Sequence, residues 1–249
     1  MKALFTLLLT MACSSCAELE PKTFKGKDGT EVLYRIASPA TIEAGKTYPL
    51  VLFLHGSGER GNDNKLQLKN GVNAILENAD KLGQPLFLIA PQCPKDKTWA
   101  PYLIDPQSTA DGKTDNPLLD AVLELVHETA SQHPVDPNRI YITGMSMGGF
   151  ATWAAIAKEP ETFAASIPVC GAGDPRTAHL FKDMPIRIFH GADDPTVAPE
   201  GSQMMLDALK IAGSDATLTL YPGVAHDCWT QTYANEEVIR WLLAQTKSH

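Results

Sequence analysis

The chain has 249 residues, of which 44% are hydrophobic and 20% are charged, a composition typical of a globular protein with one substantial core. The formal net charge is −8 at pH 7, and the sequence has no run of Lys or Arg. These features argue against nucleic acid and anionic membrane surfaces as partners.

Residues 1–17 predict an export signal that precedes the folded protein. Lys2 is followed by an apolar stretch over residues 3–11, which is far shorter than the ~20 residues that a membrane-spanning helix needs. Small residues just before Glu18 fit a signal-peptide cleavage site. We expect residues 1–17 to be a signal peptide and residues 18–249 to form a single domain. The mature protein is expected to be periplasmic or extracellular, with no transmembrane segment.

The five cysteines fall into two groups. Cys13 and Cys16 lie within the export signal, so a lipoprotein acylated on one of them is the alternative to simple cleavage. Cys93, Cys170 and Cys228 lie near predicted strand ends or in a loop, and an odd set of three does not resemble a disulfide framework. We interpret these three as small buried residues. The sequence has no Cys or His cluster at the spacing of a zinc site.

From about residue 48, apolar strand-like segments alternate with helical segments. Strands are predicted near residues 31–37, 48–55, 86–90, 139–143, 165–170, 185–190 and 216–221. Helices are predicted over residues 65–79, 117–131, 147–158, 200–212 and 235–245. This alternation predicts an α/β fold with a doubly wound, mostly parallel sheet and helices on both faces. The first strands have no helix between them, so they are expected to pair antiparallel at one edge.

Two early loops follow predicted strands. The first, residues 56–61, is rich in glycine, and the second, residues 91–116, is long and contains Trp99. A long loop at a strand end often shapes a binding site. Trp99 is therefore a candidate for stacking on a sugar or an aromatic acyl group, and packing within the protein framework is the alternative.

Ser146 lies at the centre of the most informative segment, Gly-Met-Ser-Met-Gly. It follows a predicted strand and precedes a predicted helix, the context in which Gly-x-Ser-x-Gly forms a strained turn that presents the serine hydroxyl above the sheet. Gly144 and Gly148 would allow the strand and the helix to approach closely. An ordinary glycine-rich turn is the alternative, and a later acid and histidine are needed to decide.

The rest of the chain supplies both, in the order that such a fold requires. Asp194 and His226 each follow a later predicted strand, and the carboxyl ends of parallel strands meet at one edge of the sheet. We therefore expect Ser146, Asp194 and His226 to converge. Asp193 is the less favoured acid, interpreted as a turn residue. Trp229, close to His226, is a second candidate for substrate contact, with framework packing preferred.

Together these side chains predict nucleophilic catalysis. His226 would take the Ser146 proton as the hydroxyl attacks a carbonyl carbon, and Asp194 would hold the imidazole in the useful tautomer. The charge that develops on the carbonyl oxygen needs donors, which we assign to the main-chain N–H groups of Ser57 and Met147. A flexible turn is the alternative for the loop around Ser57. This chemistry needs no metal and no organic cofactor.

These motifs resemble those of the α/β-hydrolases. The matching segments are residues 55–61, 90–94, 136–141, 144–149, 190–194 and 226–229. Within these, the chain resembles short secreted bacterial esterases, a group labelled predicted peptidase or phospholipase/carboxylesterase and similar to feruloyl and acetylxylan esterases. The resemblance implies the α/β-hydrolase fold and a Ser-Asp-His triad, and its His-Gly-x-x-Asp pattern places the acid on Asp194.

We therefore expect a secreted serine carboxylesterase that works through an acyl-enzyme on a small-molecule or carbohydrate-linked ester. Feruloyl or acetyl esters of plant-wall carbohydrate are the first candidates. A peptidase of the prolyl-oligopeptidase type ranks second, because such enzymes usually add a propeller domain that is not expected in a chain of this length. A thioesterase or lysophospholipase ranks third. A binding protein on an inactive hydrolase scaffold is the candidate from another class, and the sequence carries no signal for oligomeric state.

Overall fold

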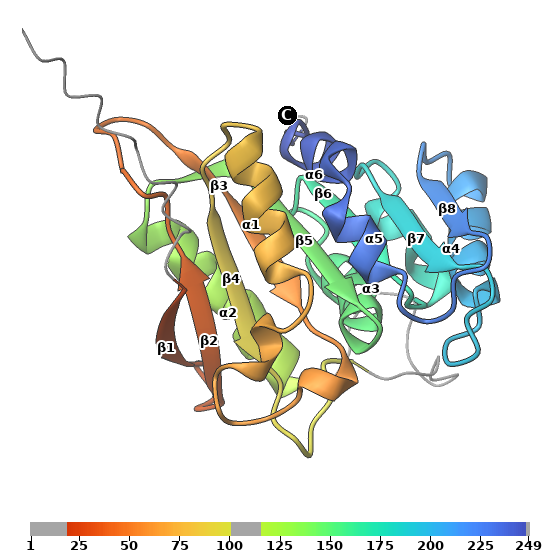
Figure 1. Cartoon of the computed structure of the whole chain (residues 1–249), viewed down its shortest axis with the longest axis horizontal. Helices are drawn as coiled ribbons and strands as arrows, with labels where there is room; N and C mark the ends of the chain where they lie inside the picture. Colours follow the sequence, from red (N-terminus) through yellow and green to blue (C-terminus); the bar gives the residue numbers. More distant parts are fainter. Residues whose placement is uncertain (1–18, 101–115, 248–249) are drawn as a thin grey trace, which may run out of the picture.

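The computed structural model describes residues 19–100 and 116–247. The predicted signal peptide with its two cysteines, and residues 101–115 of the predicted long loop, lie outside the described residues. The described residues form an eight-stranded sheet in the order β1-β2-β4-β3-β5-β6-β7-β8 (Figure 1). Its strands are β1 (Glu20–Lys25), β2 (Glu31–Ala37), β3 (Tyr48–Leu54), β4 (Phe87–Gln92), β5 (Val135–Met145), β6 (Ala165–Val169), β7 (Arg187–Gly191) and β8 (Thr217–Tyr221).

The sheet is mostly parallel, which confirms the predicted α/β fold. Every pairing from β4 to β8 is parallel, whereas β2 is antiparallel to both β1 and β4. The antiparallel edge is therefore where the sequence predicts it, but β2 and β3 are not neighbours. β1 is an additional strand that the sequence pattern does not predict, because Phe24 is its one buried residue and the segment lacks an alternating apolar pattern.

Helices cover both faces of the sheet. They are α1 (Val72–Lys81), α2 (Pro117–Gln132), α3 (Met147–Lys158), α4 (Glu200–Ile211), α5 (Trp229–Ala234) and α6 (Glu236–Leu243), with the short 3₁₀ turns η1 (Ser57–Glu59), η2 (Leu66–Leu68) and η3 (Pro175–Phe181). α1, α5 and α6 pack on one face, and α2, α3 and α4 pack on the other (Figure 1). Successive side chains of a strand point to opposite faces, so the central strand β3 is buried along its whole length.

Two predicted helices differ from the observed ones. The predicted helix over residues 65–79 is interrupted, because Gly71 adopts a φ of 78° between η2 and α1. A Cβ on Gly71 would lie 2.6 Å from the Phe53 ring, so glycine is needed there. The predicted helix over residues 235–245 is preceded by the unpredicted α5, and Asn235 separates the two by capping the N-terminus of α6. The other predicted elements are found within a few residues of their expected ends.

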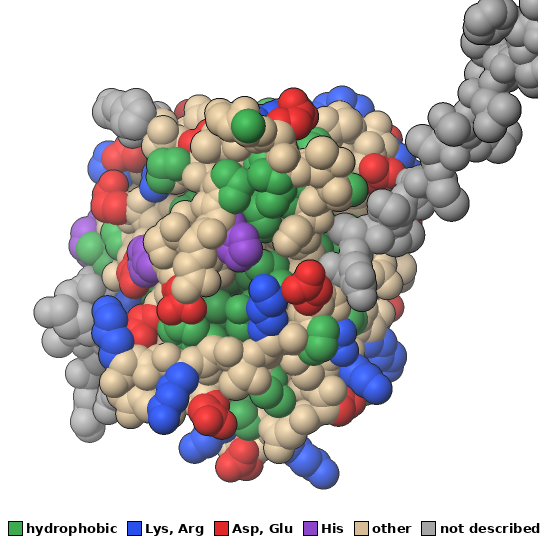
Figure 2. Space-filling view, turned by 90° about the vertical axis from the view of Figure 1, so that its left-hand side faces the viewer, with side chains coloured by type: hydrophobic (Ala, Val, Ile, Leu, Met, Phe, Trp, Pro, Cys, Tyr) green, Lys and Arg blue, Asp and Glu red, His purple; other side chains and the backbone are tan. Residues whose placement is uncertain are grey.

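Figure 2 views the side of the molecule where β1 and β2 are the outermost strands. Acidic and basic side chains are interspersed there among hydrophobic ones, and on the coloured surface of this face neither sign forms a continuous patch. Among the helices of residues 19–100 and 116–247, none is long and apolar enough to cross a lipid bilayer.

Candidate active site

Ser146 stands between β5 and α3 in a strained backbone conformation. Its φ of 53° and ψ of −118° lie in a region that residues other than glycine rarely occupy. Its N–H donates a hydrogen bond to the Val169 carbonyl oxygen at the end of β6, at 2.9 Å. The turn is thereby tied to the neighbouring strand, in the strand-to-helix context of a nucleophile elbow.

Close backbone contacts explain the glycines around Ser146. A Cβ on Gly148 would lie 1.9 Å from the Leu54 carbonyl oxygen, and a Cβ on Gly144 would lie 2.3 Å from the carbonyl oxygen of Gly148. No side chain fits at either position, so β3, β5 and the start of α3 can approach only with glycine there. Two of the predicted structural roles in this segment, those of Gly144 and Gly148, therefore have a direct steric basis.

The structure brings Ser146, His226 and Asp194 into one hydrogen-bonded chain. Nε2 of His226 lies 2.9 Å from the Ser146 Oγ, and Nδ1 of His226 lies 2.6 Å from Oδ2 of Asp194. The Asp194 side chain is fully buried, whereas that of His226 is 20% exposed. The imidazole therefore connects a buried carboxylate to a hydroxyl just past the carboxyl end of β5.

The Asp194 carboxylate is held by its own loop. Oδ1 accepts hydrogen bonds from the backbone N–H groups of Thr196 and Val197, at 2.8 and 3.0 Å. Burial by itself opposes ionisation, but the hydrogen bonds from His226, Val197 and Thr196 outweigh it and lower the pKa of Asp194 below its ordinary value. The group is thus an anion at neutral pH, suited to orient an imidazole.

The neighbouring Asp193 does not take part in this hydrogen-bonded chain through its side chain. Its side chain is exposed, and its backbone N–H donates to the Val224 carbonyl oxygen at 3.0 Å. A Cβ on Gly191 would lie 2.0 Å from the Ala225 carbonyl oxygen. The loop after β7 and the loop before His226 are therefore packed backbone against backbone, which brings the acid and the imidazole together.

His190 also contacts the carboxylate, a contact that the sequence pattern does not predict. It is completely buried at the end of β7, and its Nε2 lies 3.2 Å from Oδ2 of Asp194 and 2.9 Å from the Val197 carbonyl oxygen. Its position four residues before Asp194 is the one sequence signal that could have indicated this contact.

A second buried histidine organises the loop after β3. The His55 Nε2 accepts the Cys93 backbone N–H at 2.9 Å, so the ring proton must be on Nδ1, which donates to the Gly56 carbonyl oxygen at 2.6 Å. Burial lowers the pKa of His55 to about 4, so the ring is neutral at pH 7. Gly56 lies beside Ser146, because a Cβ on Gly56 would be 3.6 Å from the Ser146 Cβ.

The two predicted oxyanion donors lie in different loops, one after β3 and one after β5. Ser57 begins η1, and Met147 begins α3 directly after Ser146. The first N–H groups of a helix have no partner within it. Neither of these two backbone N–H groups donates a hydrogen bond within residues 19–100 and 116–247, so both remain available for a ligand.

The two candidate aromatic contacts lie in different settings. Trp99 is completely buried, packs edge-on against the His55 ring at 5.2 Å between centroids, and donates its indole N–H to the His55 carbonyl oxygen. Of the two roles expected for Trp99, this setting favours packing within the protein framework over stacking on substrate, because an indole without exposed surface cannot present a face to a ligand. Trp229 is partly exposed and stands perpendicular to the His226 ring at 5.2 Å, so it lies beside the imidazole.

The described cysteines are buried and free. Cys93, Cys170 and Cys228 form no disulfide, as expected of small buried residues. Burial raises the pKa of Cys93 to about 12 and also raises the pKa of Cys170. Both thiols are therefore neutral at physiological pH and unsuited to act as nucleophiles.

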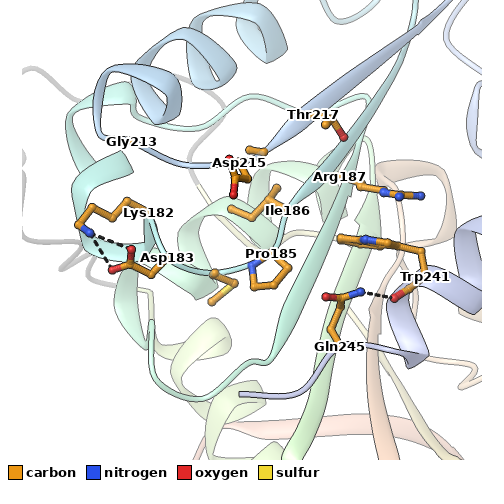
Figure 3. A pocket seen from close by; sticks show the side chains of 12 residues that line it. Lys182, Asp183, Pro185, Ile186, Arg187, Gly213, Asp215, Thr217, Trp241 and Gln245 are labelled. Carbon is orange, nitrogen blue, oxygen red and sulfur yellow. Dashed lines mark hydrogen bonds and ion pairs between the residues drawn. The ribbon is translucent and has the colours of Figure 1, made fainter. Parts of the chain in front are cut away.

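A cavity of about 430 Å³ lies at the opposite end of the strands. Arg187 and Thr217, which begin β7 and β8, line it together with Trp241, over whose ring the Arg187 guanidinium stacks at 4.5 Å (Figure 3). Asp194 and His226 follow the other ends of the same two strands. This cavity is thus separated from the hydrogen-bonded chain by the length of the sheet.

Comparison with known proteins identifies hydrolases as relatives of this chain. The sequence model of the dienelactone hydrolase family matches residues 101–238, a range that includes Ser146, Asp194 and His226. A probable carboxylesterase of Arabidopsis thaliana, described as SOBER1-like, is 28% identical over 205 residues, which cover 76% of this chain and 74% of the plant protein.

Two solved structures extend the comparison. The crystal structure of a thermostable esterase is 39% identical with a TM-score of 0.85, and the match covers 92% of this chain and 63% of that one. This chain therefore spans less than two thirds of the thermostable esterase. The feruloyl esterase module from Clostridium thermocellum is 16% identical with a TM-score of 0.68, and the match covers 95% of this chain and 92% of the module. At that identity the likeness concerns the fold, and it agrees with the predicted α/β-hydrolase architecture.

Proposed function

This chain belongs to the dienelactone hydrolase family, and from that membership we propose that it hydrolyses carboxylic esters through an acyl-enzyme on Ser146. The observation that carries the proposal is the chain of hydrogen bonds from the strained Ser146 through His226 to the buried Asp194. The same arrangement of roles recurs in serine hydrolases of unrelated folds. The esterase relatives support an ester as the substrate.

In the proposed reaction His226 is the general base. As the Ser146 Oγ attacks the ester carbonyl carbon, its proton passes over 2.9 Å to Nε2 of His226. Asp194 stabilises the imidazolium that forms. Collapse of the tetrahedral intermediate breaks the ester C–O bond, and Nε2 returns the proton to the departing alcohol. Water then attacks the acyl-serine by the same route and releases the acid.

We assign the oxyanion to the backbone N–H groups of Ser57 and Met147. The carbonyl of Gly56 and the N–H of Ser57 belong to one trans peptide and point in opposite directions. His55 Nδ1 holds the carbonyl at 2.6 Å, so the Ser57 N–H is turned away from His55. A donor fixed in this way before the reaction stabilises the developing charge without reorganisation.

The proposed substrates are feruloyl or acetyl esters of carbohydrate, and the proposed location is outside the cytoplasm. The feruloyl esterase module with the same fold and the partly exposed Trp229 beside His226 support an acyl group that can contact an aromatic ring. The export signal expected over residues 1–17 supports the location, since plant-wall polymers do not enter cells.

The test is an assay of the purified chain against p-nitrophenyl acetate, p-nitrophenyl butyrate, methyl ferulate and a proline p-nitroanilide peptide. Ester turnover that disappears in Ser146→Ala is the expected result, together with loss of labelling by a fluorophosphonate probe. The ratio of ferulate to acetate turnover ranks the two acyl groups. Preferential cleavage of the anilide would move the protein to the peptidases, and labelling that persists in Ser146→Ala would refute the assigned nucleophile.

A further inference from the structure

Two imidazoles share one oxygen of the Asp194 carboxylate. Oδ2 lies 2.6 Å from Nδ1 of His226 and 3.2 Å from Nε2 of His190, while Oδ1 accepts two backbone N–H groups. All four hydrogen-bonding positions of the carboxylate are therefore occupied. If either ring turned away, the carboxylate would lose one of the contacts that fix its plane.

The contacts of His190 determine where its proton is. Nε2 faces two acceptors, the Asp194 carboxylate and the Val197 carbonyl oxygen at 2.9 Å, so this nitrogen must carry a hydrogen. Nδ1 lies 2.7 Å from the hydroxyl oxygen of Ser202 in α4. The Ser202 hydroxyl has one proton and two acceptors beside it, the Gly171 carbonyl oxygen at 3.1 Å and, when the His190 ring is neutral, Nδ1.

Burial distinguishes the two histidines. His190 and Ser202 are completely buried, whereas the His226 side chain is 20% exposed. Burial lowers the pKa of His190, and although the Val197 carbonyl and Asp194 oppose this effect they do not cancel it. The other ionisable groups acting on this site are His226 and Cys170, and the Cys170 thiol is neutral because burial raises its pKa.

We propose that His190 is a positioning residue of the reaction: as a neutral Nε2–H tautomer it fixes the Asp194 carboxylate toward His226 without adding a competing charge. Because His190 stays neutral, the charge of Asp194 is left to stabilise the imidazolium that forms on His226. A positive charge on His190 would instead compensate Asp194 and repel that imidazolium. This inference rests on the roles proposed above for Ser146, Asp194 and His226.

The test compares two substitutions that differ in hydrogen bonding. His190→Gln keeps an amide N–H that can reach Asp194 and has no titrating group, whereas His190→Leu fills similar space without a donor. We expect His190→Leu to lower kcat on p-nitrophenyl acetate about tenfold at nearly unchanged KM, because the lost contact matters most when His226 is charged. The acid limb of its kcat/KM profile should also move. His190→Gln should restore kcat to within about threefold and restore the wild-type profile.

The opposing results are equally defined. A His190→Leu variant that is folded and retains the wild-type kcat and pH profile would overturn the proposal. So would a His190→Gln variant as impaired as His190→Leu with an unmoved profile, since that pattern indicates packing alone. If His190→Leu does not fold, ¹⁵N NMR of the wild-type imidazoles decides, because the proposal requires a neutral His190 protonated on Nε2 at pH 7.

The NMR result does not depend on which ester is cleaved. Ser146→Ala, measured in the same assay, reports separately on the proposed function. Activity that persists in Ser146→Ala refutes the nucleophile, whereas an imidazolium or an Nδ1–H tautomer at His190 refutes the positioning role alone.

Discussion

Gly191→Ala tests whether the contact between two loops sets the position of the His226 imidazole. A Cβ at this position would lie 2.0 Å from the Ala225 carbonyl oxygen and 2.4 Å from that of Val224, whereas real Cβ atoms essentially never come within 3.0 Å of such atoms. The obstacle is backbone, so no rotation of a side chain relieves it. The segment before His226 must therefore retreat by roughly 1 Å.

That displacement acts directly on the 2.9 Å contact between His226 Nε2 and the Ser146 Oγ, because Ala225 is the adjacent residue. A misplacement of about 1 Å can lower a rate about 100-fold, and the overpacking should cost about 1–3 kcal/mol of stability. We expect kcat/KM for p-nitrophenyl acetate to fall about 100-fold in a protein that still unfolds cooperatively. Steady-state kinetics and thermal unfolding measure the two effects.

Gly83→Ala is the matched control. Gly83 lies just after α1 with a φ of 62° and no atom within 4 Å of an added Cβ. The substitution should therefore cost about 1–2 kcal/mol through backbone strain alone and leave kcat/KM unchanged. If Gly191→Ala keeps at least half of the wild-type kcat/KM, or if both variants lose activity in proportion to stability, the positional argument is refuted.

Three further predictions concern single residues. Ser146→Gly should abolish turnover and raise the free energy of unfolding by about 1 kcal/mol or more relative to Ser146→Ala, because glycine adopts a φ of 53° without strain; equal unfolding midpoints would contradict the strained turn. Asp194→Asn should lower kcat by several orders of magnitude, roughly the 10⁴-fold known for an acid of this type, while the exposed Asp193→Asn stays close to wild type; the reverse ranking would move the acid to Asp193. His55 has a pKa of about 4 in the folded protein against about 6.5 in the unfolded chain, so the unfolded chain binds more protons between these values and stability should fall as pH drops from about 6.5 to about 4. Chemical unfolding across that window should give a shallower pH dependence for His55→Gln, and an identical slope would show that His55 does not titrate there.

Local sequence determined the glycine-flanked turn at Ser146 and the order of the motifs along the chain. The approach of β3, β5 and α3 excludes a Cβ at Gly144 and at Gly148. Because only glycine satisfies this steric constraint, the two residue types reveal it in the sequence. The central strands are equally predictable from sequence, because β3 is buried on both faces and is therefore continuously apolar. β1 could not be predicted from sequence, because Phe24 is its one buried residue and the strand therefore has no apolar pattern.

Tertiary structure decided which polar groups meet. His190 is followed by Gly, like His55, and the two look alike in sequence, yet one contacts Asp194 and the other holds the Gly56 carbonyl. Trp99 was a plausible surface aromatic until its burial against His55 became visible. A strand or a tight turn depends on neighbours along the chain. The Trp99–His55 contact instead joins residues 44 positions apart, and the His190–Asp194 contact depends on the path of the loop after β7, so residue type alone specifies neither.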